Sequence, residues 1–155
     1  MAEMNPRIGV DPGLGGAVAY IYGDHVEVWD MPVVPRRTGK GREVCAALLH
    51  NLVNEIPTVH AYVERVSAMP GQGVTSMFSL GRSLGIVEAT LACCEFSYVL
   101  VTPSVWKRRA GLIGKPKDAS RTLAIQMYPQ LADQLKRKKD VGRADALLIA
   151  HFGEA

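Results

Sequence analysis

The order in which strand-like and helix-like segments follow one another restricts the fold of this chain more than any other feature of its sequence. Three short apolar runs come first and are separated only by turn signals, which is typical of an antiparallel meander. Helical periodicity then alternates with two further strand-like runs, and strands joined through a helix require a right-handed parallel crossover. We therefore predict an α/β fold with a mixed sheet of about five strands, three antiparallel and then two parallel, with helices on both faces.

Turn signals and periodicity also indicate where each element begins and ends. Proline closes the first helix at Pro57 and the last strand at Pro103. Loops are expected at 31–41, 67–74 and 111–116, with a polar, basic connection at 129–139. The expected strands are 7–11, 17–22, 26–29, 59–66 and 97–101, and the expected helices are 43–55, 75–95, 105–109, 117–128 and 142–152.

The composition fits one folded domain that spans residues 1–155. Hydrophobic residues make up 48% of the chain and charged residues 21%, which excludes disorder as the main state. No apolar run approaches the roughly 20 residues of a spanning helix, and the polar start does not resemble a signal peptide. The three cysteines have no zinc-ligand spacing. We expect a cytoplasmic protein with no membrane partner, bacterial or phage-encoded rather than organellar.

Positive charge is unevenly distributed along the chain. Between Ser104 and Arg143 there are eleven basic and only three acidic residues. A second basic cluster lies in the loop at 31–41 and just after it. Clustered positive charge is the electrostatic mark of a polyanion partner, although one cluster alone could be a solvated face. Several clusters together favour nucleic acid as the partner.

Three carboxylates stand in otherwise apolar surroundings. Asp11 ends the first strand, Glu64 ends the fourth, and Asp145 shares a helix face with apolar residues. If the first and fourth strands are parallel neighbours, Asp11 and Glu64 emerge side by side at the carboxyl edge of the sheet. Adjacent carboxylates repel unless a proton or cation lies between them, and oxygen ligands suit Mg²⁺ or Mn²⁺. Taken singly, the three could also be a turn residue, an ion-pair partner of Arg65 and a helix cap.

An ordered set of motifs resembles the RuvC-type Holliday junction resolvases of the ribonuclease H-like superfamily, and within them the branch of phage and chloroplast enzymes. The opening Asp-Pro-Gly also begins sugar-kinase-like ATPases, but this chain is too short for their two lobes. The motifs that carry the resemblance are Gly9-Val10-Asp11-Pro12-Gly13 with Gly16-Ala17, Val28-Trp29-Asp30-Met31-Pro32, Val63-Glu64, the segment 71–85, Thr102-Pro103-Ser104-Val105-Trp106-Lys107, and the segment 140–150.

The resemblance implies a single RuvC-like nuclease domain with a ribonuclease H-like fold. It implies a crossover junction endodeoxyribonuclease of DNA recombination and repair, which makes paired, symmetric nicks in four-way DNA and leaves 5′-phosphate and 3′-hydroxyl ends. It also implies two Mg²⁺ ions, replaceable by Mn²⁺, held by four carboxylates that act in catalysis. Three of these match Asp11, Glu64 and Asp145.

The fourth acid departs from the bacterial pattern. Bacterial members have Asp or His three residues before the final Asp, where this chain has Gly142. The phage and chloroplast branch has an acid five residues before it, which is Asp140. A five-residue offset turns about 140° on a helix, so we expect Asp140 on the lead-in, beside the start of the helix that carries Asp145.

Basic and loop residues are the candidates for contact with DNA. Lysines and arginines around a glycine-rich loop suit phosphate contacts, and Met69 could wedge between bases at the branch point, or be buried in an ordinary loop. The candidates are Arg36, Arg37, Met69, Lys107, Arg108, Arg109, Lys115, Lys117 and Arg143.

The long helix predicted at 75–95 offers a surface for a homodimer, which would match the two-fold symmetry of a junction. It has a stripe of small residues, and packing of this stripe on the protein's own sheet is the alternative. A separate apolar stripe could face the sheet. The small stripe consists of Gly81, Gly85, Ala89 and Cys93, and the apolar stripe of Leu80, Leu84, Val87 and Leu91.

Two other functions remain open at this point. The basic loops fit equally well a ribonuclease H-like nuclease that acts on RNA–DNA hybrids or structured RNA. Because Gly142 replaces the acid found in bacterial members, the chain could also be a catalytically degraded protein that only binds junctions. Both alternatives share the predicted fold and differ from the first in substrate or in catalysis.

Overall fold

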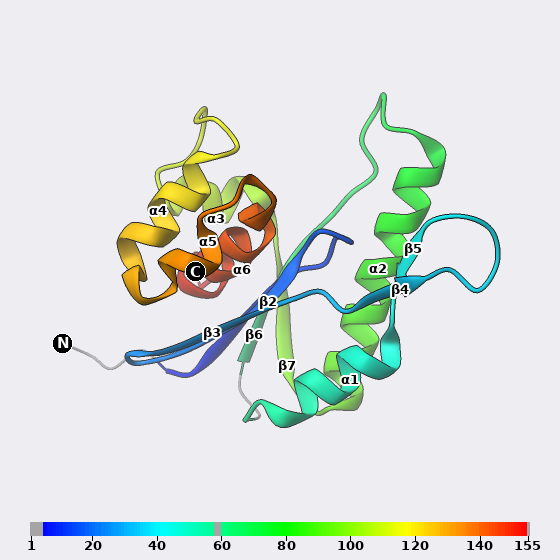
Figure 1. Cartoon of the computed structure of the whole chain (residues 1–155), viewed down its shortest axis with the longest axis horizontal. Coiled ribbons are helices and arrows are strands. Elements are labelled where there is room, and N and C mark those ends of the chain that lie inside the picture. Colours follow the sequence, from blue (N-terminus) through cyan, green and yellow to red (C-terminus); the bar gives the residue numbers. More distant parts are fainter. Residues whose placement is uncertain (1–4, 58–59, 155) are drawn as a thin grey trace.

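A five-stranded mixed sheet forms the centre of the molecule in a computed structural model that describes residues 5–57 and 60–154 (Figure 1). The strand order is β3-β2-β1-β6-β7, in which β1, β2 and β3 are antiparallel and β1, β6 and β7 are parallel. The predicted sheet is confirmed, and Val59, which we placed in the fourth strand, lies outside the described residues. The strands are β1 Arg7–Asp11, β2 Ala17–Tyr22, β3 His25–Asp30, β6 His60–Glu64 and β7 Ser97–Val101.

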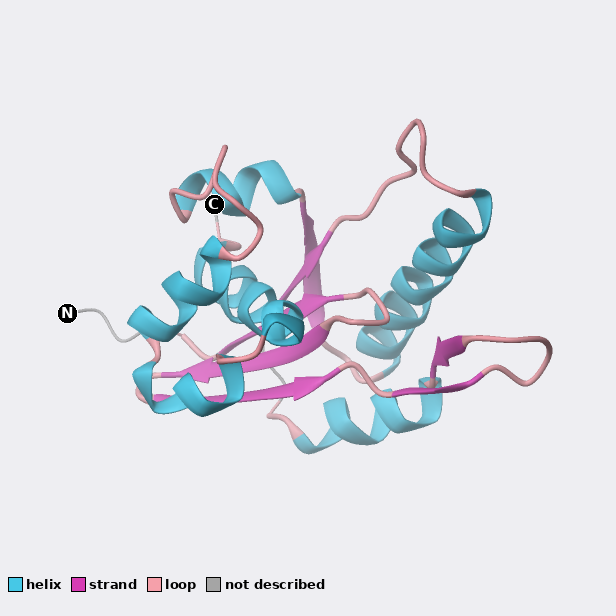
Figure 2. Cartoon of the chain, turned by 45° about the horizontal axis from the view of Figure 1, so that its top comes forward, coloured by secondary structure: helices cyan, strands magenta, loops and turns pink. Residues whose placement is uncertain are grey.

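Helices cover both faces of the sheet, as predicted (Figures 1 and 2). The sheet has a hydrophobic core on each face. Helices α1 and α2 pack against the core on one face, and α3, α4 and α6 pack against the core on the opposite face. In the described residues, none of the helices has the length and apolarity needed to cross a membrane. The helices are α1 Ala46–Glu55, α2 Val74–Cys93, α3 Pro103–Arg109, α4 Ala119–Met127, α5 Ala132–Leu135 and α6 Val141–Phe152, with 3₁₀ turns η1 Pro129–Leu131 and η2 Lys138–Asp140.

Two segments differ from the prediction. The loop and the start of the first predicted helix form an antiparallel ribbon of β4 (Val33–Pro35) and β5 (Arg42–Val44), so that helix begins only at 46. Val44 is buried in the core, and its helical spacing from later apolar residues made the helix look longer. The connection at 129–139 contains α5 and two 3₁₀ turns, because buried Leu131 and Leu135 anchor it to the core.

Helix α6 lies directly against β1 and the turn that follows it. A Cβ atom on Gly9 would come within 2.1 Å of the Ala146 carbonyl oxygen, and one on Gly142 within 2.0 Å of the Gly15 carbonyl oxygen. Only glycine permits such close contact between backbones. The two glycines therefore fix α6, and the site residue it carries, relative to the end of β1.

Candidate active site

Three carboxylates from different elements meet at the carboxyl edge of the sheet. Asp11 ends β1, Glu64 ends the parallel neighbour β6, and Val10 and Val63 are paired just before them. Asp145 lies in the second turn of α6, which packs on β1 and β2. Glu64 interacts electrostatically with both other carboxylates. The topology therefore brings the three residues to the same edge of the sheet, and their role as a common site stays a prediction.

Each of the three carboxylates has its own polar partner. Asp11 Oδ1 accepts a hydrogen bond from the Gly13 backbone N–H at 3.2 Å, and Glu64 Oε2 accepts one from the Trp106 indole N–H at 2.7 Å. Asp145 is approached by the Ser120 hydroxyl, which also lies 3.2 Å from the Lys117 carbonyl oxygen. Each carboxylate is therefore held by a different donor.

Burial and mutual repulsion change the acidity of the three groups. Burial, and then the neighbouring Asp11, raises the pKa of Glu64 to about 7. Burial also raises the pKa of Asp145 to about 6 and the pKa of Asp11 above its ordinary value. Lys107 and Lys117 act in the opposite direction, because their positive charges lower the pKa of Asp11 and of Asp145. Near neutral pH the cluster therefore retains protons that a cation could replace.

A metal ion shared by the cluster would require the side chains to turn toward it. Across residues 5–57 and 60–154, no three Asp, Glu, His or Cys side chains converge closely enough, as they stand, to hold one ion. The donor set nevertheless fits a hard divalent cation, because it consists of carboxylate oxygens that repel one another in a half-buried setting. The side chains that would need to rotate are those of Asp11, Glu64 and Asp145.

Trp106 is a site residue to which the sequence analysis assigned no role. Its side chain is fully buried, and its single polar atom donates to Glu64. A buried indole N–H normally needs a hydrogen-bond acceptor. A tryptophan that follows a strand and a Thr-Pro helix start was therefore the signal in the sequence that could have indicated this contact. Helix α3, with Pro103 in its first turn, places this donor beside the end of β6.

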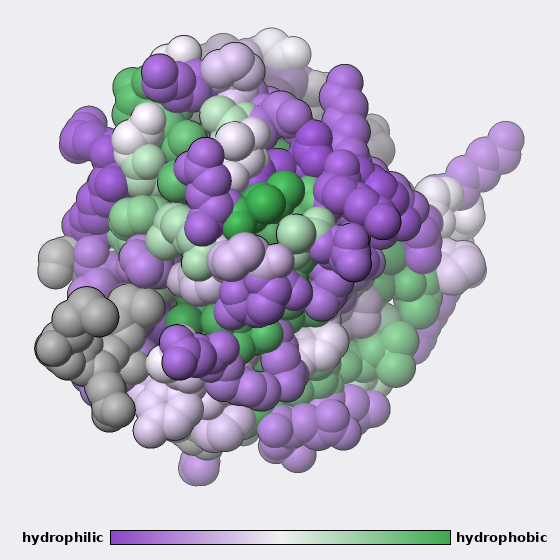
Figure 3. All heavy atoms as spheres, turned by 60° about the vertical axis from the view of Figure 1, so that its left-hand side comes forward, coloured by the Kyte–Doolittle hydropathy of each residue, from purple (hydrophilic) through white to green (hydrophobic). Residues whose placement is uncertain are grey.

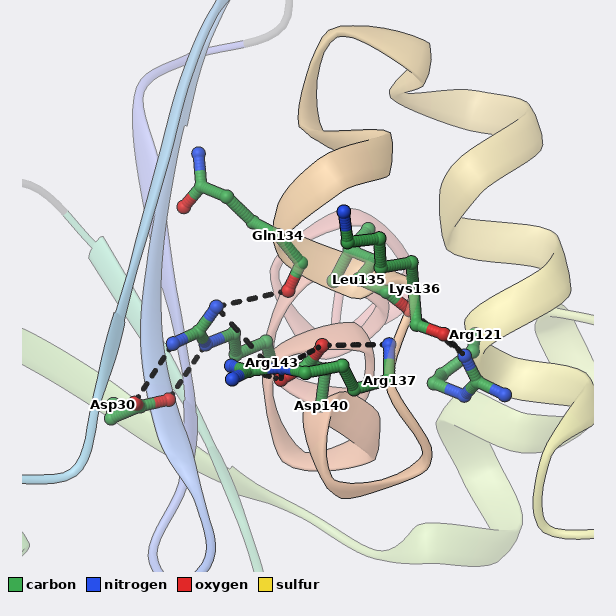
Figure 4. Close-up of polar contacts among 8 residues, drawn as sticks. All are labelled: Asp30, Arg121, Gln134, Leu135, Lys136, Arg137, Asp140 and Arg143. Carbon is green, nitrogen blue, oxygen red and sulfur yellow. Dashed lines mark hydrogen bonds and ion pairs between the residues drawn. The ribbon is translucent and has the colours of Figure 1, made fainter.

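Asp140 has different partners from the other three acids (Figure 4). Its side chain is 2% exposed, and it accepts hydrogen bonds from the Arg137 guanidinium at 2.9 Å and from the Arg137 backbone N–H at 2.9 Å. The Arg143 guanidinium lies 3.9 Å away. Burial raises the pKa of Asp140, but the hydrogen bonds and charges of Arg137 and Arg143 outweigh burial and lower it. The structure does not bring Asp140 to the carboxylate cluster, and its assignment as a metal ligand stays a prediction.

Two of the predicted DNA contacts are engaged inside the protein. Arg143 donates to both carboxylate oxygens of Asp30, at 2.7 and 2.9 Å, and to the Gln134 carbonyl oxygen, and so ties the end of β3 to α5 and α6 (Figure 4). Arg109 donates to the Phe152 carbonyl oxygen at 2.9 Å. These contacts occupy guanidinium N–H groups of Arg143 and Arg109 that would otherwise be available to a DNA phosphate.

The other candidates are all at least partly exposed. Lys107 and Lys117 stand near the carboxylates, and Met69, 58% exposed, lies in the loop between β6 and α2. On the side of the molecule where α4 and α5 lie, hydrophilic residues cover most of the surface (Figure 3). Arg108 and Lys115 are exposed, and Arg36 and Arg37 lie in the segment that joins β4 to β5.

Comparison with known proteins finds relatives in sequence and in fold. No family model matches the chain. The chloroplastic Holliday junction resolvase MOC1 of Chlamydomonas reinhardtii is 35% identical over 150 aligned positions, and the match covers 79% of this chain and 17% of that protein. The chain therefore spans about a sixth of the length of this curated relative.

A solved structure of another protein has the same fold. T. thermophilus RuvC in complex with a Holliday junction substrate matches with a TM-score of 0.63 and 16% identity, over 95% of this chain and 90% of that chain. A second Thermus thermophilus RuvC structure matches with a TM-score of 0.49 and 14% identity, over 96% of each chain. The first match shows that the chain has the α/β, ribonuclease H-like fold that the sequence predicted.

Proposed function

We propose that this chain is a RuvC-type Holliday junction resolvase, a crossover junction endodeoxyribonuclease that makes paired nicks in four-way DNA. The observation that carries the proposal is the meeting of Asp11, Glu64 and Asp145 at one sheet edge, with Lys107 and Lys117 beside them. The relationship in sequence to a chloroplast resolvase and the fold shared with RuvC support it. The products would carry 5′-phosphate and 3′-hydroxyl ends.

The three carboxylates would hold divalent magnesium, with manganese as a substitute. Bound ions would stabilise charge on the attacking and leaving oxygens of the phosphodiester and lower the pKa of the attacking water. Two ions and a fourth ligand, Asp140, complete the proposed set, and Asp140 would have to leave Arg137 to join it.

The protein's own residues orient the reacting groups. Trp106 fixes one oxygen of Glu64 and leaves the other for a ligand. Lys107 and Lys117, whose charges already act on the carboxylates, are placed to hold the phosphate at the site. Helix α6 and the turn after β1 fix the distance between Asp11 and Asp145.

Replacing Trp106 by phenylalanine tests this role of the indole. The hydrogen bond favours charged Glu64, so its loss should raise the pKa of Glu64 further, by about one unit or more. Cleavage near neutral pH should then fall about tenfold and recover as the pH rises. The measurement is the cleavage rate as a function of pH, with Trp29→Phe, on the other core, as the control. A Trp106→Phe profile that matches the control would contradict this role.

The exposed face of α2 is proposed as a homodimer interface with a second copy of this chain. Gly81 and Gly85 have open space where a Cβ would lie, so the small-residue stripe does not pack on the protein's own sheet. Val74 and Phe78, on the same face, are 80% and 74% exposed. The apolar stripe faces the core through Val87 and Leu91, as expected. Two sites related by a two-fold axis would match a junction with two strands to cut.

Phe78→Asp should convert the dimer into a monomer, because a charge would be buried at the centre of the proposed interface. The monomer should make single nicks where the wild type makes paired ones. Sedimentation and a cruciform-plasmid assay, which separates nicked from linear product, measure the two effects. Tyr22→Asp, an exposed apolar residue on the distant β2–β3 hairpin, is the control. A Phe78→Asp protein that remains dimeric excludes this interface.

The choice of substrate tests the proposed function. We expect Mg²⁺-dependent, symmetric nicks in a synthetic four-way junction and none in a linear duplex of the same sequence. An RNA–DNA hybrid should stay intact beside it. Cleavage of the hybrid alone would support the other nuclease class, and binding of the junction without cleavage would support a degraded, binding-only protein.

A further inference from the structure

A groove of about 520 Å³ lies between the β4–β5 ribbon and α2. Figure 1 shows the ribbon passing beside α2, and Figure 2 shows the loop between β4 and β5 reaching outward from the body. None of the residues that line the groove is acidic. Its polar lining consists mainly of three cations, Arg36, Lys40 and Arg42, and of the α2 hydroxyls of Thr75, Ser76 and Ser79.

Two of the three cations of the groove, Arg36 and Arg42, are held by backbone oxygens and keep donors for a ligand. Arg36 donates from Nε to the Arg42 carbonyl oxygen, and Arg42 donates from one terminal nitrogen to the Val33 carbonyl oxygen, both at 3.3 Å. A guanidinium carries five N–H donors, so most remain for another partner. Glu43, the acid next to Arg42 in β5, forms an ion pair with Arg82, which offsets its charge. The groove is therefore a preorganised, positively charged surface.

Two of the residues that line the groove come from segments that directly follow the carboxylates in the sequence. Leu14, three residues after Asp11, lines it, and so does Gln72, from the loop that follows Glu64. These segments, 12–16 and 65–73, link the groove to the ends of β1 and β6, which carry Asp11 and Glu64. Cations and hydroxyls contact phosphate oxygens without reading bases, so this groove fits a sugar–phosphate backbone of any sequence.

The proposed dimer leaves the groove open. At about 100° per residue, the centre of the α2 positions that line the groove lies about 170° around the helix from the centre of the face formed by Gly81 and Gly85. A second copy on the glycine face would thus not cover the groove. Each protomer of a dimer would present one such groove.

We propose that the groove between the β4–β5 ribbon and α2 binds the backbone of one DNA strand as it leaves the carboxylate site. This inference rests on the proposed function, because it takes junction DNA as the substrate. In this proposal the β4–β5 ribbon, which the sequence analysis did not predict, contributes to the affinity for DNA and takes no part in the chemical step.

The test removes the groove's charge without touching the carboxylates. The triple variant Arg36→Gln, Lys40→Gln, Arg42→Gln is compared with Lys136→Gln, Lys138→Gln, Lys139→Gln, which removes the same charge from exposed positions outside the groove. Junction affinity is measured as a function of salt, and cleavage at saturating protein. A second variant, Ser79→Glu, places a carboxylate in the groove and leaves every ribbon contact intact, in case loss of the arginines unfolds the ribbon.

We expect the groove variant and Ser79→Glu to bind a four-way junction at least about tenfold more weakly than the control variant. The groove variant should also lower the salt slope of binding by about three, as three lost phosphate contacts require. A loss of cleavage at saturating protein that exceeds the loss of affinity would contradict a role in binding alone. Equal affinities of the groove and control variants, in a wild type that binds and cuts junctions, would overturn the groove alone. A wild type that does not bind junctions would overturn the proposed function as well.

Discussion

Asp11→Asn should lower the rate of junction cleavage by at least about 1,000-fold and leave junction binding within a few-fold of the wild type. Loss of a charged ligand at the reacting phosphate removes several kcal/mol of stabilisation, and each 1.36 kcal/mol is about tenfold in rate. Asparagine retains an oxygen that can accept the Gly13 N–H, so the turn after β1 should keep its shape. Single-turnover cleavage and gel-shift titration on the same labelled junction measure the two effects.

The same variant should be more stable than the wild type at about pH 8 without metal. The folded state raises the pKa of Glu64 to about 7 and of Asp145 to about 6, well above the ordinary carboxylate range. Raised pKa values favour the fold at low pH, and this contribution is lost as pH rises through 6 and 7. Asp11→Asn removes one of the charges that repel Glu64 and Asp145, so the variant should lose less stability than the wild type as the pH rises. An Asp11→Asn protein that cuts junctions normally, or that melts below the wild type at this pH, would contradict this account of the cluster.

Gly142→Ala should destabilise the protein by about 3 kcal/mol or more and lower the melting midpoint by roughly 10 °C. The added Cβ would lie 2.0 Å from the Gly15 carbonyl oxygen and 3.1 Å from the Gly16 Cα. Both are backbone atoms, so relief requires α6 to move as a whole, although it is packed tightly on β1. Because α6 carries Asp145, cleavage should fall with stability.

Gly15→Ala is the matched control for Gly142→Ala, since a Cβ on Gly15 meets nothing within 4 Å although the residue belongs to the same contact. It should melt close to the wild type. The lack of space at Gly142 also accounts for a departure from the bacterial pattern, in which an acid stands three residues before the final Asp. A side chain at position 142 has no space here, so Gly142→Asp should be destabilised rather than gain a ligand. A fully stable Gly142→Ala protein would show that α6 does not approach the turn this closely.

The sheet and the main carboxylates could be predicted because local patterns and a few topological rules determine them. A meander followed by crossovers makes β1 and β6 parallel neighbours, and this alone places Asp11 beside Glu64. The ribbon could not be predicted, because the spacing of Val44 fits the helix that follows as well as it fits a strand.

Long-range side-chain contacts left no local signal. Arg143 binds Asp30 across 113 positions of sequence, so it looked like a free cation available for DNA. Asp140 differs from these, because its partner Arg137 lies only three residues before it, and their pairing depends on a 3₁₀ turn in a segment expected to be an irregular connection. The Trp106–Glu64 hydrogen bond similarly joins α3 to β6. Such pairings follow from packing in three dimensions, which residue spacing does not encode.

Thermal unfolding at about pH 8, with and without Mg²⁺ at constant ionic strength, tests most directly whether the carboxylate cluster holds a divalent cation. A cation that binds only the folded state should raise the midpoint of the wild type by several degrees. The same addition should leave Asp11→Asn and Asp145→Asn almost unchanged, because each lacks a ligand. An equal rise in all three proteins, or no rise in any of them, would contradict the claim that Asp11, Glu64 and Asp145 form a metal site.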